Sequence, residues 1–261
     1  IYLDSRAKKQ IESQLCRGFF KISGMNAFKV LKALYLTGGV AATPKDPLWK
    51  YQWVKENEPE NFKQVHKWLD VRDYLVLRCT DRFTMTKDSA NITFLFDTRK
   101  GKHRWHRGLC REYGVEMVHL PRVVSATDRV GGLTLNAARD LGLVKGTPVF
   151  AGGGDVPLTT VGAGCVNLYD THIYVGTSGW VVSNVDRRLV DIDNFMASIL
   201  GAMENRYNYV GEQETSGACL TWVKDHLALD EIGVYLDRAF ARTPSQELDK
   251  LYDLLNASVE Q

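Results

Sequence analysis

The chain has 261 residues, of which 44% are apolar and 25% are charged, and its formal net charge at pH 7 is +2. A chain of this length and composition can bury a sizeable core in one large or two modest domains, and its balanced charge argues against a polyanion partner. It has no basic segment followed by an apolar run and no apolar stretch near the ~18 residues of a membrane span, so we expect a cytoplasmic protein without membrane contact.

The cysteines and histidines show no metal-binding pattern. The five cysteines are odd in number, scattered and without a Cys-x-x-Cys pair, which indicates reduced thiols and argues against zinc. The six histidines contain no His-x-x-x-His spacing. We therefore expect no metal ion bound by protein side chains alone.

The chain is predicted to begin with a helix that follows a short polar segment, Asp-Ser-Arg, at residues 4–6. Ala7, Ile11, Leu15 and Phe19 recur every four residues, which places them on one face of that helix. This face should pack against the rest of the protein.

Several further elements can be assigned from periodicity. Residues 27–36 carry a second helical pattern, which the glycine pair at residues 38–39 ends. Residues 61–69 also predict a helix, whereas residues 74–78 and 92–96 are strand-like or buried.

The middle of the chain contains a basic run and another helix. Residues 99–107 carry lysine, arginine and histidine around Trp105, a pattern that in a small basic domain would suggest nucleic-acid binding. A single run in a balanced chain is more typical of a solvated turn, so we expect no nucleic-acid partner. Residues 133–141 predict a helix with Thr134 near its cap.

The most informative segment is Gly-Gly-Gly-Asp at residues 152–155, which follows an apolar segment, residues 148–151, that predicts a strand. Three glycines allow a sharp turn and leave Asp155 exposed at the start of a helix with Pro157 in its first turn. An aspartate there is also an ordinary helix N-cap, which requires no catalytic role. The dinucleotide-binding fingerprint requires a glycine at the position of Asp155, which argues against a dinucleotide-binding site here.

A second candidate loop follows this helix. Residues 171–175 predict a strand, and Gly176, Thr177, Ser178 and Gly179 predict a turn whose backbone N–H groups and hydroxyls could bind an anion. The same residues also suit an ordinary tight turn. Strand, acid, helix, strand and anion loop occur in an order that indicates a cleft for phosphoryl transfer.

The last part of the chain predicts a domain boundary and three helices. The short helix after Asp155 leads to a new run of strands, so we place the boundary near residue 166. Ser216, Asp230 and Ser245 each precede an amphipathic pattern and are expected to cap a helix.

Ordered motifs along the chain support a family resemblance. Residues 2–6 read Tyr-Leu-Asp-Ser-Arg, and residues 50–57 read Lys-Tyr-Gln-Trp-Val-Lys-Glu-Asn. These resemble the Trp-x-Asp-x-Arg element, with Tyr2 replacing the tryptophan, and the first signature of the FGGY carbohydrate kinases; Pro47 fits that signature and Lys45 departs from it. Further matches lie at residues 73–75, 88–90, 96–97, 120–121, 152–155 and 176–178. The sequence Ala-Gly-Gly-Gly-Asp at residues 151–155 is most similar to that of the xylulokinase branch.

The resemblance implies an α/β fold of the actin-like, ribonuclease-H-like two-domain sugar-kinase type. Residues 1–166 would be the C-terminal part of the first, sugar-binding domain, and residues 167–261 the N-terminal part of the second, ATP-binding domain. The family's Asp-x-Gly-Thr phosphate loop is not found before Ile1, nor its adenosine-binding segment before Gln261. We therefore expect an internal fragment that is inactive by itself.

The resemblance also implies an activity, its ligands and its first site residue. The reaction would be ATP- and Mg²⁺-dependent phosphorylation of a sugar hydroxyl, with a ketopentose such as D-xylulose as substrate. Asp155 would contact the sugar and act as general base, because phosphoryl transfer needs a carboxylate to orient and deprotonate the attacking hydroxyl.

The remaining site residues follow from the same resemblance. Gly176, Thr177 and Ser178 would face the ATP phosphates, and Asp4 and Arg6 would lie at the sugar end of the cleft. For Asp4 and Arg6 a structural role, as a cap and salt bridge of the following helix, is an equal alternative, and the aspartate and serine at residues 88–89 are expected to stabilise a turn.

Other functions stay open at this point. Glycerol, gluconate or ribulose are alternative substrates within the same family. The fragment could also be a non-catalytic actin-like module that binds a sugar or a partner. A homodimer is compatible with the resemblance.

Overall fold

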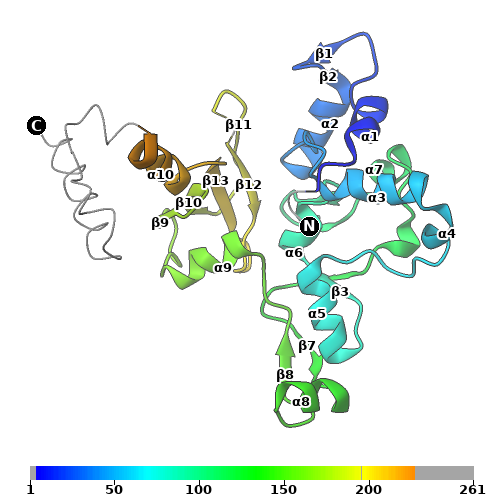
Figure 1. Cartoon of the computed structure of the whole chain (residues 1–261), viewed down its shortest axis with the longest axis vertical. Coiled ribbons are helices and arrows are strands. Elements are labelled where there is room, and N and C mark those ends of the chain that lie inside the picture. The colour runs from blue at the N-terminus through cyan, green and yellow to red at the C-terminus, as the bar shows by residue number, and fades with distance from the viewer. Residues whose placement is uncertain (1–3, 195, 227–261) are drawn as a thin grey trace, which may run out of the picture. The chain divides into compact units, whose positions relative to one another are not determined.

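The computed structural model describes residues 4–194 and 196–226 (Figure 1). Tyr2 and the helices predicted after residues 230 and 245 lie outside the described residues. Contacts divide the chain into two compact units, unit 1 with Ile1–Ile173 and Trp180–Glu212, and unit 2 with Tyr174–Gly179 and Gln213–Gln261. The boundary predicted near residue 166 stays a prediction.

The helices of the described chain are mostly short. They are α1 (Lys8–Gln14), α2 (Ala27–Thr37), α3 (Pro47–Asn57), α4 (Pro59–Phe62), α5 (Val71–Thr80), α6 (Lys87–Asn91), α7 (Arg107–Glu112), α8 (Leu135–Leu141), α9 (Asp155–Gly162) and α10 (Gly217–His226), with a 3₁₀ turn at Met117–His119. Among these described helices, none is both long and apolar enough to cross a membrane.

The strands lie between these helices, singly or in runs, and five of them, β9 to β13, follow one another between α9 and α10. They are β1 (Lys21–Ile22), β2 (Met25–Asn26), β3 (Thr84–Thr86), β4 (Phe96–Asp97), β5 (Arg104–Trp105), β6 (Arg122–Val124), β7 (Arg129–Gly132), β8 (Pro148–Phe150), β9 (Thr171–Val175), β10 (Gly179–Val185), β11 (Val190–Asp191), β12 (Met196–Leu200) and β13 (Tyr207–Gln213). In the described residues they form the pairs β1-β2, β3-β6, β4-β5 and β7-β8 and a sheet in the order β11-β12-β13-β10-β9.

Local signals place several helix ends as predicted. The Asn26 side chain accepts a hydrogen bond from the Lys29 N–H and begins α2, and Gly38, at φ +80°, ends it in the left-handed conformation. Thr134 caps α8 in the same way by accepting from the Ala137 N–H. These predictions are confirmed because each depends on residues within one turn of the helix end.

The prediction for the first helix is only partly confirmed. Ala7, Ile11 and Leu15 are buried on one face of the segment that contains α1, as expected. Phe19 is fully exposed, because the helix ends at Gln14 and the chain turns into the β1-β2 hairpin. The four-residue spacing of Phe19 therefore does not reflect a shared helix face.

Two other sequence predictions are wrong. Residues 74–78 lie in α5, which the Asp70 carboxylate caps by accepting from the Val71 N–H, and the buried Asp73 and Thr80 are spaced as on a helix. Burial and capping here outweigh the strand propensity of the aromatic and β-branched residues. Residues 61–69 are not a continuous helix, because α4 ends at Phe62 and the chain then turns away.

The segment at residues 92–96 is a turn that leads into a short strand. Leu95 and Phe96 are completely buried, whereas Ile92 is partly exposed, and only Phe96 belongs to β4. Thr93 is 2% exposed, so the expectation of burial is confirmed for Thr93, Leu95 and Phe96 and is wrong for Ile92.

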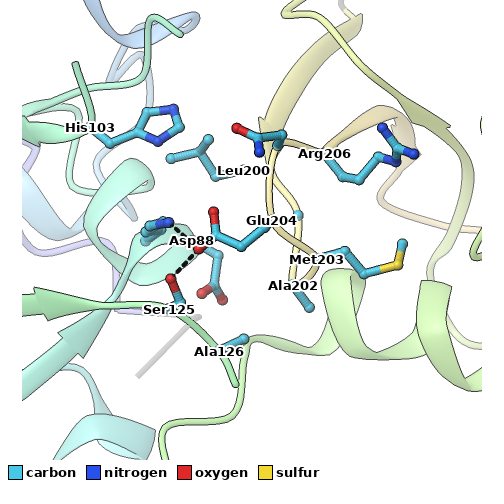
Figure 2. A pocket seen from close by; sticks show the side chains of 12 residues that line it. Asp88, His103, Ser125, Ala126, Leu200, Ala202, Met203, Glu204 and Arg206 are labelled. Carbon is cyan, nitrogen blue, oxygen red and sulfur yellow. Dashed lines mark hydrogen bonds and ion pairs between the residues drawn. The ribbon is translucent and has the colours of Figure 1, made fainter. Parts of the chain in front are cut away.

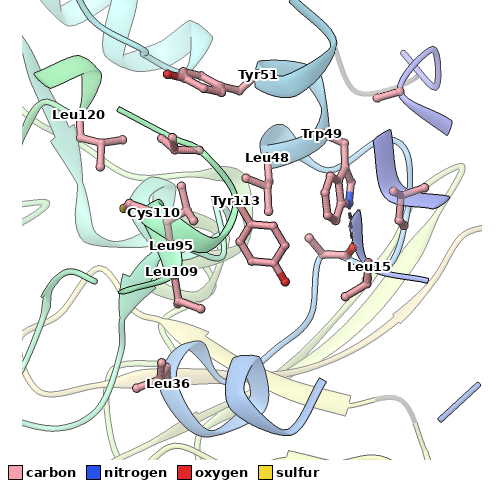
Figure 3. Close-up of a cluster of buried hydrophobic side chains, with 14 residues drawn as sticks. Leu15, Leu36, Leu48, Trp49, Tyr51, Leu95, Leu109, Cys110, Tyr113 and Leu120 are labelled. Carbon is pink, nitrogen blue, oxygen red and sulfur yellow. Dashed lines mark hydrogen bonds between the residues drawn. The ribbon is translucent and has the colours of Figure 1, made fainter. Parts of the chain in front are cut away.

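The larger core of unit 1 is built around α3 (Figure 3). Trp49 is completely buried, its indole N–H donates to the Ala41 carbonyl at 2.8 Å, and its ring meets Tyr113 edge-on at 5.6 Å between centroids. The Tyr51 hydroxyl lies 2.8 Å from Nδ1 of His119 in the same core. The signature segment at residues 50–57 thus lies in a helix that packs the core.

We expect Trp49→Ala to lower the free energy of unfolding of the chain by ~3–5 kcal/mol, because it removes a large buried ring and leaves a cavity. Urea denaturation followed by circular dichroism measures this change. Phe19→Ala is the control and should change stability by less than about 0.5 kcal/mol, since its side chain is exposed. Similar losses in the two variants would contradict the core described above.

Candidate functional site

The candidate site of unit 1 is the glycine segment, residues 152–154, which joins β8 to α9. At its start, the N–H of Ala151 donates to the Asp128 carbonyl at 3.0 Å, and the N–H of Gly152 donates to the Ala126 carbonyl at 2.9 Å. Gly152 has φ +73°, a conformation that favours glycine. The loop after β6 therefore holds the first half of the segment by its backbone.

The second half of the segment passes close to other side chains. A Cβ atom at Gly153 would lie 3.2 Å from Leu158, and one at Gly154 would lie 3.1 Å from the Asp88 carboxylate. Asp88 itself is only 6% exposed and accepts a hydrogen bond from the Gly154 N–H at 2.5 Å. Glycine therefore leaves room for Leu158 at Gly153 and for the buried Asp88 carboxylate at Gly154.

Asp155 is the first residue of α9 and not its cap. Gly154 is the N-cap residue, so the interpretation of Asp155 as a helix N-cap is wrong. One oxygen of Asp155, Oδ1, accepts from the Val156 N–H at 2.9 Å, and the side chain is exposed. A carboxylate in the first turn is favoured by the helix dipole, and its exposure makes it accessible to a ligand.

Arg72, on α5, supports the other end of the segment. Its Nη1 donates to the Ala151 carbonyl at 2.9 Å, and its Nη2 donates to the Thr86 hydroxyl at 2.6 Å and to the Ser89 hydroxyl. The same Nη2 lies 3.0 Å from the Asp73 carboxylate. The guanidinium is thus held by three side chains while it binds the backbone that precedes the glycines.

Asp73 is a buried carboxylate with incomplete hydrogen bonding. It is 2% exposed, and its Oδ2 atom has no hydrogen-bond partner among the described residues. Burial raises its pKa to about 7, although the neighbouring Arg72 guanidinium acts in the opposite direction. Near neutral pH, Asp73 therefore exchanges between its charged and neutral forms.

A small pocket lies beside Asp88 on α6 (Figure 2). Lys87 Nζ lies 2.7 Å from Oε1 of Glu204, and the Ser125 hydroxyl donates to the same oxygen. These hydrogen bonds lower the pKa of Glu204, and burial lowers the pKa of His103, which also lines the pocket. The paired charges fasten the turn between β12 and β13 to α6.

The predicted anion loop lies in unit 2. The Gly176 N–H donates to the Ser178 carbonyl at 2.8 Å within the turn. This N–H is therefore used inside the loop, and donors for an anion would have to come from the other backbone N–H groups and from the hydroxyls of Thr177 and Ser178. Thr177 is exposed and Ser178 is half-buried.

The start of α10 packs directly on this turn. The N–H of Gly217 donates to the Gly176 carbonyl at 2.7 Å, and the N–H of Ser216 donates to the Thr177 carbonyl at 2.8 Å. A Cβ atom at Gly217 would lie 2.5 Å from the Gly176 carbonyl oxygen, and one at Gly179 would lie 2.7 Å from Ser216. Glycine at these positions lets the turn and the helix end approach closely. The helix predicted after Ser216 is confirmed.

Asp4 and Arg6 pair with each other. The guanidinium of Arg6 donates two hydrogen bonds to the Asp4 carboxylate, at 3.0 and 2.9 Å, and lies 4.1 Å from the centre of the Trp53 ring. These bonds lower the pKa of Asp4 to about 2. Of the structural alternative, the salt bridge is present, whereas the capping position of α1 belongs to Ala7. Their place at the sugar end of a cleft stays a prediction.

The basic run at residues 99–107 is divided among several structural roles. Arg99 is paired with the buried Asp97 through two hydrogen bonds, at 2.9 and 2.7 Å. Arg104 and Trp105 form β5, and His106 caps α7 by accepting from the Leu109 N–H. Much of this run therefore has a structural role, in an ion pair, in a strand and in capping a helix.

Sequence reasoning missed most of the groups that hold the glycine segment. Arg72 was not recognised, and Asp88 and Ser89, expected to stabilise a turn, lie in α6 and are buried. Arg72 and Asp88 stand among other polar residues in the sequence and carry no local signal, and their backbone partners lie about 65 to 80 residues away along the chain. Within the described residues no group of three or more His, Cys, Asp or Glu side chains is arranged to hold a metal ion.

Comparison with known proteins supports the resemblance found in the sequence. The model of the N-terminal domain of the FGGY family of carbohydrate kinases matches residues 23–162. A xylulose kinase of Bacillus subtilis (strain 168) is 31% identical over 183 residues, which make up 70% of this chain and 36% of that protein. The chain therefore spans little more than a third of the length of this relative.

Solved structures show the same partial coverage. The ligand-bound xylulose kinase of Lactobacillus acidophilus matches with a TM-score of 0.68 at 22% identity, over 76% of this chain and 39% of that one. The glycerol kinase of Plasmodium falciparum, solved with ADP, matches with a TM-score of 0.73 at 16% identity, over 89% and 45%. At these identities the likeness concerns the fold, and it confirms the predicted α/β fold of actin-like sugar kinases.

We expect the free energy of unfolding to fall less steeply between pH 4 and 7 in Asp73→Asn than in the unchanged chain. The pKa of Asp73 rises from 3.8 to about 7 on folding, so its contribution to stability is fully present below about pH 3.8 and is lost as the pH rises through 7. Denaturant titrations at several pH values measure the slope. Asp140→Asn, at an exposed carboxylate, is the control; parallel curves for the unchanged chain and Asp73→Asn would contradict the prediction.

Proposed function

Because this chain belongs to the FGGY family of carbohydrate kinases, we propose that the complete protein transfers the γ-phosphoryl group of ATP to a hydroxyl group of a sugar. Enzymes of this family are ATP-dependent phosphotransferases. The observation that carries the proposal is the exposed carboxylate of Asp155, presented at the first position of α9 by a glycine segment that is held at both ends.

Asp155 would act as the general base. Phosphoryl transfer depends mainly on positioning and charge stabilisation, so the chemical demand on the protein is a carboxylate that orients the attacking hydroxyl. Asp155 would accept the hydroxyl proton as the sugar oxygen forms a bond to the γ-phosphorus and the bond to ADP breaks.

The remaining site residues are assigned by the same proposal. Thr177, Ser178 and the backbone at Gly176 would face the ATP phosphates, and Asp4 and Arg6 would lie at the sugar end. Mg²⁺ would enter with ATP, whose phosphate oxygens and bound water supply most of its ligands, and would neutralise charge on the transferred group.

The proposal includes the organisation of the complete protein. Residues 1–166 would belong to the sugar-binding domain and residues 167–261 to the ATP-binding domain, with a hinge near residue 166 that lets a cleft close and exclude water. Since the chain spans 36% of the Bacillus subtilis relative, we propose that residues 1–261 alone do not turn over ATP. The proposal that the complete protein forms a homodimer rests on the family resemblance alone.

A ketopentose such as D-xylulose is the proposed sugar. Support comes from the sequence Ala-Gly-Gly-Gly-Asp at residues 151–155 and from the similarity to the xylulose kinase of Bacillus subtilis. Glycerol, gluconate and ribulose are the alternatives, because discrimination among such substrates depends on a few buried hydrogen bonds.

In the full-length protein, we expect Asp155→Asn to lower kcat by roughly 10²–10⁴, because the amide has nearly the same shape but cannot accept the proton. A coupled assay of sugar-dependent ADP formation measures kcat, and thermal unfolding checks that the Tm is nearly unchanged. The exposed Asp140→Asn serves as the matched control and should keep full activity. Near-normal kcat in Asp155→Asn would reduce Asp155 to a structural role.

The substrate proposal predicts that D-xylulose has the highest kcat/KM in a panel with ribulose, L-fuculose, gluconate and glycerol. A site that hydrogen-bonds the hydroxyls of one sugar rejects analogues that leave its buried polar groups unpaired. Steady-state kinetics of the full-length protein with each compound provide the comparison. Preference for glycerol or gluconate would refute the ketopentose while leaving the kinase assignment intact.

A further inference from the structure

Two charged side chains, neither of which takes part in the proposed chemistry, hold the glycine segment from its two ends. Arg72 donates to the Ala151 carbonyl at 2.9 Å, and Asp88 accepts from the Gly154 N–H at 2.5 Å. We propose that Arg72 and Asp88 are positioning residues that set the place of the Asp155 carboxylate. This inference rests on the proposed function, since it concerns the same site.

The segment needs such support because glycine has the greatest backbone freedom of any residue. Three glycines in a row could adopt many conformations. The carboxylate of Asp155, which follows them, would then have no fixed position. The loop after β6 binds the backbone of Ala151 and Gly152. Gly154, which immediately precedes Asp155, is instead held by the Asp88 side chain.

Both side chains are themselves held in place. The guanidinium of Arg72 is bound to the hydroxyls of Thr86 and Ser89 and to the carboxylate of Asp73. Asp88 is almost completely buried on α6. Because Arg72 and Asp88 are fixed in this way, their hydrogen bonds also fix the backbone at Ala151 and Gly154.

The Asp88 bond acts at the residue that decides where α9 begins. Gly154 is the N-cap of α9, so its position sets the start and direction of the helix. Asp155 is the next residue, and its Cα–Cβ bond direction follows from that start. A displacement of about 1 Å in a catalytic group can cost about 100-fold in rate, so loss of this bond should appear in kcat.

The test is a double-mutant cycle in the full-length protein with Asp88→Ala, Asp155→Asn and the combined variant, using D-xylulose and ATP. We expect Asp88→Ala to lower kcat by roughly 10- to 100-fold with little change in the KM for the sugar. In the Asp155→Asn background the same substitution should have little further effect, because Asp88 acts through Asp155. An equal loss of kcat in both backgrounds would overturn the proposal.

Additional variants separate positioning from folding. Asp88→Asn keeps an acceptor for the Gly154 N–H and should retain most of kcat, whereas Arg72→Lys cannot reproduce the forked contacts of Arg72 and should lower it. Asp191→Ala is the matched control, since Asp191 also accepts a backbone N–H, that of Asn194 at 3.0 Å, on a different loop. Equal activity of Asp88→Asn and Asp88→Ala would count against the hydrogen bond.

Amide hydrogen exchange distinguishes failure of this inference from failure of the proposed function. We expect faster exchange across residues 152–156 in Asp88→Ala, and unchanged exchange in Asp191→Ala. Unchanged kcat in Asp155→Asn would refute the base and therefore the catalytic role of the two positioning residues. Unchanged exchange in Asp88→Ala would refute the support of the segment, even if Asp155 is the base.

Discussion

Arg72 donates a hydrogen bond to the Ala151 carbonyl and Asp88 accepts one from the Gly154 N–H, so a half-buried guanidinium and a buried carboxylate both bind the backbone of residues 151–154. A buried charged group is costly unless it is hydrogen-bonded, and a glycine segment leaves its own N–H and C=O groups accessible to it. The buried carboxylate of Asp88 therefore needs a hydrogen-bond donor, which the backbone N–H of Gly154 provides. A Cβ atom at Gly154 would lie 3.1 Å from the Asp88 carboxylate, so a side chain there would require this contact to adjust.

The short helix α6 joins this contact to the rest of unit 1. Asp88 binds the glycine segment, Lys87 pairs with Glu204 in the turn after β12, and Asn91 Oδ1 accepts from the Leu200 N–H at 2.9 Å. A second core lies beside the same helix, formed by Met85, Ala90, Phe96, Val185, Leu200 and Tyr207. Because α6 has only five residues, its position depends on these tertiary contacts more than on helix propensity.

Predictions from the sequence succeeded where the signal is local and failed where distant contacts compete. The ends of α2 and α8 follow from Asn26, Gly38 and Thr134, which act within one turn of the helix. The turn at Gly176 was also predicted from neighbouring residues. The strand-like segment at residues 74–78 is a helix instead, since packing of α5 against β3 and the distant strands β7 and β8 and the burial of Asp73 and Thr80 override local propensity. Likewise, the cap at Gly154 was assigned to Asp155, one residue too late.

The sequence by itself determined the family, the ends of helices such as α2 and α8, and the identity of the candidate base. These depend on residue types and spacings along the chain, and short motifs such as the glycines before Asp155 carry them. Only the tertiary structure decided which side chains hold that base in place. Arg72 and Asp88 lie about 65 to 80 residues from their backbone partners, and contacts between such distant residues are set by packing, for which a single sequence has no periodic signal.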